Sequence, residues 1–194
     1  MNFRWFLLSV GAFGLGDFSH TLLILFAAQR LTGLYNAAEA VRLAALFYIF
    51  HNVIYAIFSY VSGSLADRFE KKYLLAGGYS LAAVTVALMI VSPPNLFWTG
   101  IIFGLAGLYI GTEEALEDSL AAEILPAQIR GTGFGALAFV NAIGDFASSI
   151  IIGWLWATIG LNAFLYSAVL FVVGTLLVLG LVRKNATTDA EMKR

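Results

Sequence analysis

The stretch that decides the fold runs Gly63-Ser64-Leu65-Ala66-Asp67-Arg68-Phe69-Glu70-Lys71-Lys72. It separates an apolar run that ends at Ala66 from another that opens at Tyr73. Five of the six residues at 67–72 are charged, and an ion in hydrocarbon costs at least about 2.5 kcal/mol. The stretch therefore predicts a tight hairpin between two membrane helices, lying in the headgroup region. Short basic loops stay on the cytoplasmic side, so the simplest alternative is a solvated loop that only sets orientation.

The composition is that of a membrane protein. Hydrophobic residues make up 60% of the 194 residues, charged residues 12%, and the mean hydropathy is +0.86. These values exclude an ordinary soluble domain. A bilayer crossing needs about 20 apolar residues. We predict an all-α membrane protein, a bundle over residues 1–182 with a cytoplasmic tail over 183–194, and six spans at 3–28, 44–66, 73–91, 96–122, 131–159 and 161–182.

Basic residues are distributed unevenly between the two sides of the predicted bundle. Arg30 and Arg42 fall on one side. The other side carries Arg4, Arg68, Lys71, Lys72, Arg130, Arg183, Lys184, Lys193 and Arg194. Because cytoplasmic loops carry the excess of Lys and Arg, we predict that both termini are cytoplasmic and that the number of spans is even. We expect the membrane to be a bacterial inner (plasma) membrane.

Short sequence matches recur between the two halves of the chain. The pairs are Phe13-Gly14-Leu15 with Phe103-Gly104-Leu105, Gly63-Ser64-Leu65 with Gly153-Trp154-Leu155, and Tyr79-Ser80 with Tyr166-Ser167. The offsets are 90, 90 and 87 residues, so they keep a common register. Two units of three spans each must have opposite topology, which is a common plan of secondary transporters. The sequence therefore predicts a 3+3 inverted repeat.

An acid lies in the middle of the first predicted span. Asp17 is 13 residues from Arg4 and 13 from Arg30, which at 1.5 Å per residue is ~20 Å from either charged end. An intramembrane acid marks a transport pathway by default, and His20, one turn later, is its expected partner. The alternative is a buried Asp–His pair that only fixes packing.

The second predicted span has a polar stripe at helical spacing, made of Tyr48, Asn52, Tyr55, Ser59 and Gly63. Such a stripe faces protein or water rather than lipid, and we assign Asn52 to the pathway. His51 lies off the stripe and nearer the outer surface, and three alternatives stay open for it: an interfacial residue, an internally satisfied residue or a ligand. With two histidines and no cysteine in the chain, we expect no metal site.

The fourth predicted span combines a stripe of small residues with acids. The glycine stripe, which lets another backbone come close, consists of Gly100, Gly104, Gly107 and Gly111. Glu114 and Asp118 extend the stripe, and Glu113 and Glu117 form a second acidic pair. Four carboxylates in an apolar setting cannot all stay ionised, so they must face a cavity, approach the headgroups or share protons. We expect Glu114 to be the deepest-facing member.

The fifth predicted span places Asn141, Asp145 and Ser148 on one stripe. Asp145 is 15 residues from both Arg130 and Gly160, near the bilayer midplane. Asp17 and Asp145 are thus expected to be two buried acids at similar depth. If the chain were alone in lipid, this face, the glycine stripe and the polar stripe would be open to hydrocarbon, which is costly. We therefore expect a second bundle to cover them.

The charged hairpin resembles the G-x-L-A-D-R-x-G-R-[RK] loop of the major facilitator superfamily. In that family the loop joins the second and third helices of each six-helix half and tunes the switch between inward-open and outward-open states. The resemblance implies a cytoplasmic gate made of Gly63, Asp67, Arg68, Lys71 and Lys72. Glu70 stands where that family usually has glycine.

A second stretch resembles the tenth helix and following loop of superfamily members, where an acidic helix end precedes L-P-x-x-x-R-G-T. Here it reads Leu125-Pro126 followed by Arg130-Gly131-Thr132. This resemblance implies the C-terminal six-helix half of the fold and adds Asp118, Arg130 and Gly131 to the gate. A looser one, at 15–20, is to the opening helix of that half in some bacterial drug-efflux-like members.

The resemblance implies a secondary active transporter, not an enzyme, driven by a proton or other ion gradient and by no cofactor. The implied pathway residues are Asp17, His20, Asn52, Glu114, Asn141 and Asp145. In this superfamily a small-molecule substrate binds between two six-helix bundles, so one such chain offers half a cavity. We expect as partners the lipid bilayer, the substrate and a second bundle, either a missing N-terminal half or a second copy, and no nucleic acid.

Three other classes of protein are compatible with an apolar chain of this length. A six-helix channel would need a pore ring or filter loop, yet the loops after the third and fifth predicted spans carry no charge. An intramembrane hydrolase would show G-x-S-x-G or H-E-x-x-H, and neither motif occurs. The third alternative, a non-transporting membrane fragment that needs a partner half, is not excluded by the sequence.

Overall fold

The computed structural model describes residues 3–192, with side chains over 3–180, and all regular elements in this part of the chain are helical. They are α1 (Phe3–Gly14), α2 (His20–Leu31), α3 (Ala37–Ala66), α4 (Lys71–Val91), α5 (Leu96–Ile124), η1 (Ala127–Ile129), α6 (Arg130–Ile159), η2 (Gly160–Ala163) and α7 (Phe164–Met192). The helical backbone thus continues through most of the predicted tail. Residues 193–194, and the side chains of Arg183 and Lys184, lie outside the described part.

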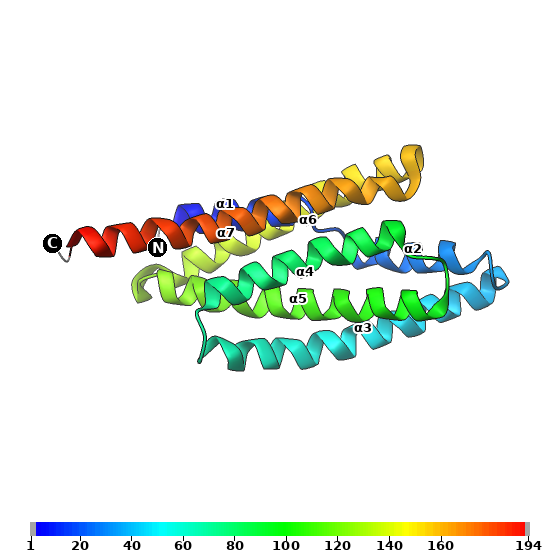
Figure 1. Ribbon diagram of the computed structural model, residues 1–194, viewed down its shortest axis with the longest axis horizontal. Coiled ribbons are helices and arrows are strands. Elements are labelled where there is room, and N and C mark those ends of the chain that lie inside the picture. The colour runs from blue at the N-terminus through cyan, green and yellow to red at the C-terminus, as the bar shows by residue number, and fades with distance from the viewer. Residues whose placement is uncertain (1–2, 193–194) are drawn as a thin grey trace.

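The long helices run along one axis of the molecule (Figure 1). Helix α5 packs between α3 and α4, α7 packs against α4 and α1, and α1 packs against α6. Helix α1 begins and α7 ends at the same end of the bundle, where the α3–α4 and α5–α6 connections also lie (Figure 1). We call this the basic end, because Arg68 lies in one of these connections and the helices that follow them begin with Lys71-Lys72 and with Arg130.

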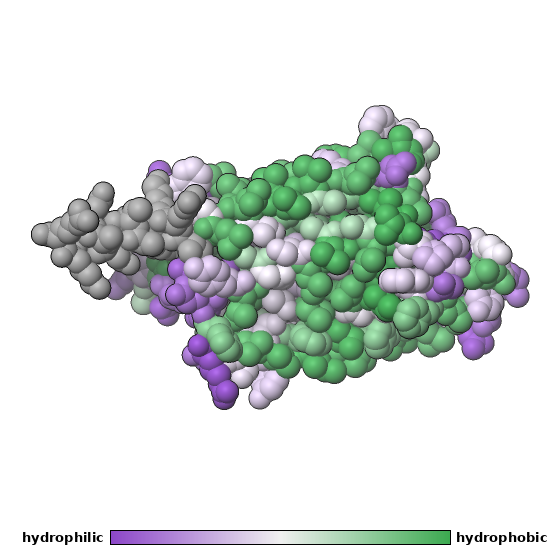
Figure 2. All heavy atoms as spheres, in the orientation of Figure 1, coloured by the Kyte–Doolittle hydropathy of each residue, from purple (hydrophilic) through white to green (hydrophobic). Residues whose placement is uncertain are grey.

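Four segments are long and apolar enough to cross a membrane: Ala37–Ala66, Lys71–Val91, Leu96–Ile124 and Ala127–Gly180. The last has 54 residues and includes α6 and the first part of α7, because the chain turns at Gly160, whose φ of 61° favours glycine. Figure 2 shows hydrophobic residues over the middle of one face and hydrophilic residues toward both ends. This distribution suits a bilayer.

The first predicted span, 3–28, is broken. α1 ends at Gly14 and α2 begins at His20, where the Ser19 side chain accepts a hydrogen bond from the Thr21 N–H at 3.2 Å. The chain between them passes close to α7, since a Cβ at Gly16 would lie 2.8 Å from the Cβ of Leu170. A continuous helix was therefore the wrong expectation for this run. The break places Asp17 outside regular helix.

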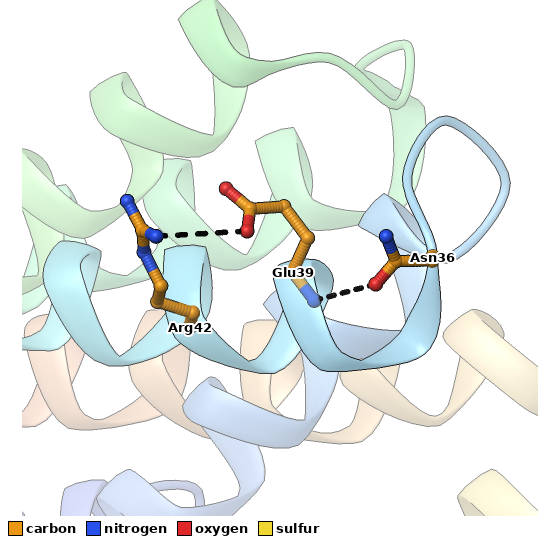
Figure 3. Close-up of polar contacts among 3 residues, drawn as sticks. All are labelled: Asn36, Glu39 and Arg42. Carbon is orange, nitrogen blue, oxygen red and sulfur yellow. Dashed lines mark hydrogen bonds and ion pairs between the residues drawn. The ribbon is translucent and has the colours of Figure 1, made fainter.

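Helix α3 begins seven residues before the predicted span, at Ala37. The side chain of Asn36 accepts a hydrogen bond from the Glu39 N–H at 2.9 Å, and the Glu39 carboxylate lies 3.8 Å from Arg42 (Figure 3). The cap satisfies one of the backbone donors that a helix start leaves unpaired. Helix α3 thus extends from the far end of the bundle to the basic end.

Three aromatic rings form the centre of the core. Phe13 of α1 stacks on Tyr79 of α4 with ring centroids 3.9 Å apart, and on Phe171 of α7 at 4.5 Å. All three side chains are almost completely buried. Because each ring comes from a different helix, this aromatic stack holds α1, α4 and α7 together.

The glycine stripe of α5 packs against α3 of the same chain. A Cβ at Gly104 would lie 3.3 Å from the ring of Phe50, and one at Gly107 would overlap the carbonyl oxygen of His51. The predicted close approach of another backbone is therefore confirmed. The expectation that this stripe would be open to lipid was wrong, because it already has a partner within the chain.

Candidate functional site

A cavity of about 470 Å³ opens beside the break in the first predicted span. It is lined by the break itself, by the start of α2, and by α5 and α6. The lining residues are Asp17, Phe18, Ser19, His20, Ile110, Glu114, Asp145, Phe146 and Ser149. Four of the six residues predicted for the pathway thus share one cavity, although they come from separate parts of the chain.

Asp17 is half-buried in the cavity wall. Its carboxylate accepts hydrogen bonds from the Phe18 N–H at 3.1 Å and from the Tyr109 hydroxyl at 3.4 Å. The Ser148 hydroxyl donates to the backbone carbonyl of Asp17, and the Ser19 N–H donates to the Ser149 hydroxyl at 3.0 Å. Two serines of α6 therefore satisfy backbone groups that the break leaves without helical partners.

His20 lines the same cavity but contacts other aromatic rings rather than Asp17. Its ring lies 5.2 Å from the ring of His51 and 5.9 Å from that of Tyr48, measured between centroids. His51 is 1% exposed, and its Nδ1 lies 3.3 Å from the carbonyl oxygen of Phe103. Among the alternatives for His51, the internally satisfied residue therefore fits the structure. Among the described residues no group of three or more His, Cys, Asp or Glu is arranged to hold a metal ion.

The acids of α5 divide between the cavity and the core. Glu114 lines the cavity, is exposed, and accepts a hydrogen bond from the Tyr55 hydroxyl of α3. Glu113 and Glu117 are instead 6% and 1% exposed. The expectation that Glu114 would be the deepest acid is therefore wrong, because the neighbouring pair Glu113 and Glu117 faces the packed interior.

Glu117 is held from two helices, and sequence reasoning missed its role. It accepts hydrogen bonds from the Tyr79 hydroxyl of α4 and, at 2.9 Å, from the Asn141 side chain of α6. Asn141 was assigned to the pathway but does not line the cavity. The only sequence signal for Glu117 was the spacing of the second acidic pair, which does not identify the partners.

Asp145 lies on the cavity wall one turn beyond Asn141 and is exposed, so it is not the buried acid that we expected. Asn52 is exposed as well, and its side chain donates to the carbonyl of Tyr48 in its own helix at 2.7 Å. Asn52 does not line this cavity.

The charged hairpin lines a separate pocket at the basic end, together with the end of α5. Lys71 lies 3.2 Å from Glu123 of α5, and Lys72 lies 2.7 Å from Glu70. Glu70 has a φ of −65° and a ψ of 112°, which any L-residue adopts without strain. This backbone does not require the glycine that the related loops usually carry.

The predicted gate residues are only partly brought together. Asp67, Arg68, Lys71 and Lys72 share the pocket at the basic end. Arg130 instead donates to the carbonyl of Leu125 at 3.2 Å. Three further predicted gate residues do not line this pocket: Gly63, Asp118 and Gly131.

The chain is similar to a curated protein from the archaeon Methanocaldococcus jannaschii, described as an uncharacterized MFS-type transporter. The two are 30% identical over 180 residues, which is 91% of this chain and 44% of the archaeal protein. The chain thus spans less than half the length of the curated relative that it matches. No family model matches the chain. No solved structure matches it. Together, the similarity to this transporter and the long apolar helices identify the chain as an integral membrane protein.

Proposed function

Because the chain belongs to the major facilitator superfamily, we propose that it forms one six-helix half, the C-terminal one, of a secondary active transporter for a small molecule. The observation that carries this proposal is the cavity, in which Asp17, Glu114 and Asp145 converge from the helix break, α5 and α6. Acids inside a membrane bundle are rare and mark substrate or ion pathways.

Six crossings fit the arrangement of the helices. Helices α1 and α2 together would make the first crossing, and α3 to α7 the remaining five. Both ends of the described chain lie at the basic end (Figure 1), as an even number of crossings requires. Because basic loops stay in the cytoplasm, the basic end would be the cytoplasmic one.

The packing pairs support a 3+3 inverted repeat. If α1 and α2 correspond to α5, α3 to α6, and α4 to α7, the contact of α3 with α5 becomes that of α6 with α1. Likewise the contact of α4 with α5 becomes that of α7 with α1, and α4 with α7 maps onto itself. The close approach of Gly14 to Gly144 between α1 and α6 matches that of Gly107 to α3.

The lining of the cavity favours a positively charged substrate. Three carboxylates line it, whereas none of the described Lys or Arg residues does. The Lys and Arg side chains whose hydrogen bonds or ion pairs are described lie near helix ends. Arg30, for example, donates to the carbonyl of Met89 at 2.7 Å. Phe18 and Phe146 add aromatic faces, which attract organic cations. The same acids would carry the coupling protons, so that proton and cation compete.

A second bundle would complete the cavity. Glu114, Asp145 and Asn52 are exposed in the single chain, and an unpaired polar side chain in hydrocarbon is costly. The exposed face of α6 also carries large aromatics, with Phe146 71% and Phe139 65% exposed. A partner of similar length, contributing the other cavity wall, would cover these groups.

The test uses proteoliposomes with a pH gradient and ethidium, a fluorescent organic cation. The chain is reconstituted alone and together with a co-expressed six-helix half from a superfamily transporter. We expect saturable ethidium flux that needs both halves and stops when a protonophore collapses the gradient. Flux that does not saturate would point to a channel. Equal flux from the chain alone would contradict the half-transporter.

A further inference from the structure

Glu117 joins two helices of the bundle through its two carboxylate oxygens. Oε1 accepts from the Tyr79 hydroxyl of α4, and Oε2 accepts from the Asn141 amide of α6. Among the described residues, the bond between Glu117 and Asn141 is the only hydrogen bond that joins a residue of α5 to a residue of α6. The side chain is 1% exposed, so water does not replace either donor.

The Tyr79 side of this link is fixed. Tyr79 is fully buried, and its ring stacks on Phe13, which stacks in turn on Phe171. A Cβ at Gly174 of α7 would lie 3.3 Å from the Tyr79 ring, which is tight packing. The hydroxyl of Tyr79 thus meets Glu117 at a place that the aromatic stack determines.

The other donor, Asn141, belongs to α6, which packs against the core less extensively than α4 does. The flanking residues Ala142 and Ile143 are exposed, and nearby contacts of α6 are made with α1 at Gly14 and with the break at Asp17. A helix joined to its neighbours by few contacts can shift at low cost.

The bond between Glu117 and Asn141 lies on the side of the cavity that faces the basic end. Glu117 is three residues beyond Glu114 on α5, and Asn141 is four residues before Asp145 on α6, so both lie about one turn nearer the basic end. Glu114 and Asp145 line the cavity on facing helices. The hydrogen bond therefore ties α5 to α6 where the cavity ends toward the basic end.

The charged groups that interact with Glu117 are acids: Glu113 and Asp118 on α5, Asp145 on α6 and Asp17 in the break. The titratable group on α4 that contacts it is Tyr79, whereas Lys71 of the same helix donates to the carbonyl of Ser119 at 3.5 Å and pairs with Glu123. No described Lys or Arg forms an ion pair with Glu117, whose described bonds come from neutral donors. A proton taken up by this group would therefore change the charge of the link without displacing a cation.

We propose that the hydrogen bond between Glu117 and Asn141 is a latch that holds α6 against α5 below the cavity, and that proton uptake by Glu117 loosens it. This inference rests on the proposed function, because a weaker bond between α5 and α6 would open the transport cavity toward the basic end. Glu117 acts here as a positioning residue, through α6 and Asp145, and does not touch the substrate.

The chemistry of the two donors determines where the proton goes. The Tyr79 hydroxyl can rotate and accept, so a proton fits on Oε1 while Oε2 still accepts from Asn141. The Asn141 bond then changes from one made to a carboxylate to one made to a neutral acid, and bonds to ionised partners are about twice as strong. Protonation thus weakens the latch while both carboxyl oxygens of Glu117 keep a hydrogen-bond partner.

The test measures the separation of α5 and α6 directly. Because the chain has no cysteine, spin labels can be attached at Ala122→Cys on α5 and Ala138→Cys on α6 in the full chain in lipid nanodiscs. Distance distributions are then recorded between pH 5 and pH 9. Two variants alter the latch: Glu117→Gln, which imitates the protonated acid, and Asn141→Leu, which removes the donor. Glu113→Gln is the matched control, since it neutralises another buried acid of α5, one turn away.

We expect the unmodified chain and Glu113→Gln to shift to a longer, broader distribution as the pH falls. Glu117→Gln and Asn141→Leu should give the broad distribution at every pH. A narrow, pH-responsive distribution in Glu117→Gln would overturn the latch, and so would loss of the response in Glu113→Gln alone. Because the measurement needs no transport, failure of the latch and failure of the transporter proposal are recognised separately. Circular dichroism checks that each variant is folded.

Discussion

Gly107 of α5 lies directly against the carbonyl oxygen of His51 of α3, and a Cβ at Gly107 would overlap that oxygen. This neighbouring atom belongs to the backbone rather than to the end of a flexible side chain, so the two helices would have to separate to admit a methyl group. The α3–α5 interface therefore depends on the absence of a side chain at this position.

The variant Gly107→Ala should lower the free energy of unfolding by about 1–3 kcal/mol, the usual cost of overpacking. Gly77→Ala is the matched control, because nothing lies within 4 Å of a Cβ there. Thermal unfolding in mild detergent, followed by circular dichroism, compares the two. Equal melting temperatures would mean that α3 and α5 do not pack as described.

The aromatic stack should dominate the stability of the core. Phe171→Ala removes a ring that is 0% exposed, and such changes typically cost about 3–5 kcal/mol. Phe146→Ala removes the same ring from a site that is 71% exposed and should cost far less. Unfolding measured side by side in the same detergent tests this difference, and a similar loss in both variants would argue against the stack.

Asp17 and Asp145 are expected to be required for transport. Asn keeps the shape of each side chain and removes its charge, so Asp17→Asn and Asp145→Asn should abolish gradient-driven ethidium flux in the completed transporter while membrane insertion stays normal. Glu39→Gln provides the control, because Glu39 lies at the far end of α3 beside Arg42 (Figure 3). Unchanged flux in both Asp variants would remove these residues from the pathway.

Asp67 is expected to affect conformation rather than substrate binding, since it lies at the end of α3 in the basic-end pocket. Asp67→Asn should change the rate at which a cysteine introduced at Asn52 reacts with a water-soluble maleimide. Arg42→Gln, at the opposite end of the same helix, should leave that rate unchanged. If Asp67→Asn alters only the orientation of the protein in the membrane, the hairpin is a topology signal and not a gate.

The replacement Glu70→Gly tests the departure of the hairpin from its superfamily pattern. At φ −65° glycine gains nothing, and it loses backbone entropy, typically about 0.5–1 kcal/mol, together with the ion pair to Lys72. We expect a small decrease in the melting temperature and no gain in transport. A marked gain in transport would mean that glycine is needed there in another conformation.

Hydropathy predicted the bounds of α4, α5 and α6 to within two residues, because charges and turn residues lie at their ends. It missed the early start of α3, although Asn36 followed three residues later by Glu39 is a readable capping pattern. It also missed the break near Asp17. The runs 5–16 and 22–28 on its two sides are mainly apolar, and the groups that satisfy the break, Ser148 and Ser149, come from a distant helix.

The candidate site was predictable only in part for the same reason. Asp17, His20, Glu114 and Asp145 were identifiable because polar residues stand out in apolar runs. Which acid of α5 faced the core was not, since a helical projection gives relative directions and no neighbours. Only the packing of α4 and α6 determines that Glu117 meets Tyr79 and Asn141.

Helix α1 begins and α7 ends on the same side of the bundle (Figure 1), and this placement determines how such units can be fused genetically. A second copy joined head to tail would enter the membrane in the same orientation, through a linker that needs no crossing of its own. A unit of three helices would instead end on the opposite side, so its tandem copy would be inverted. Gene duplication acting on this architecture is therefore expected to produce parallel pairs of whole bundles.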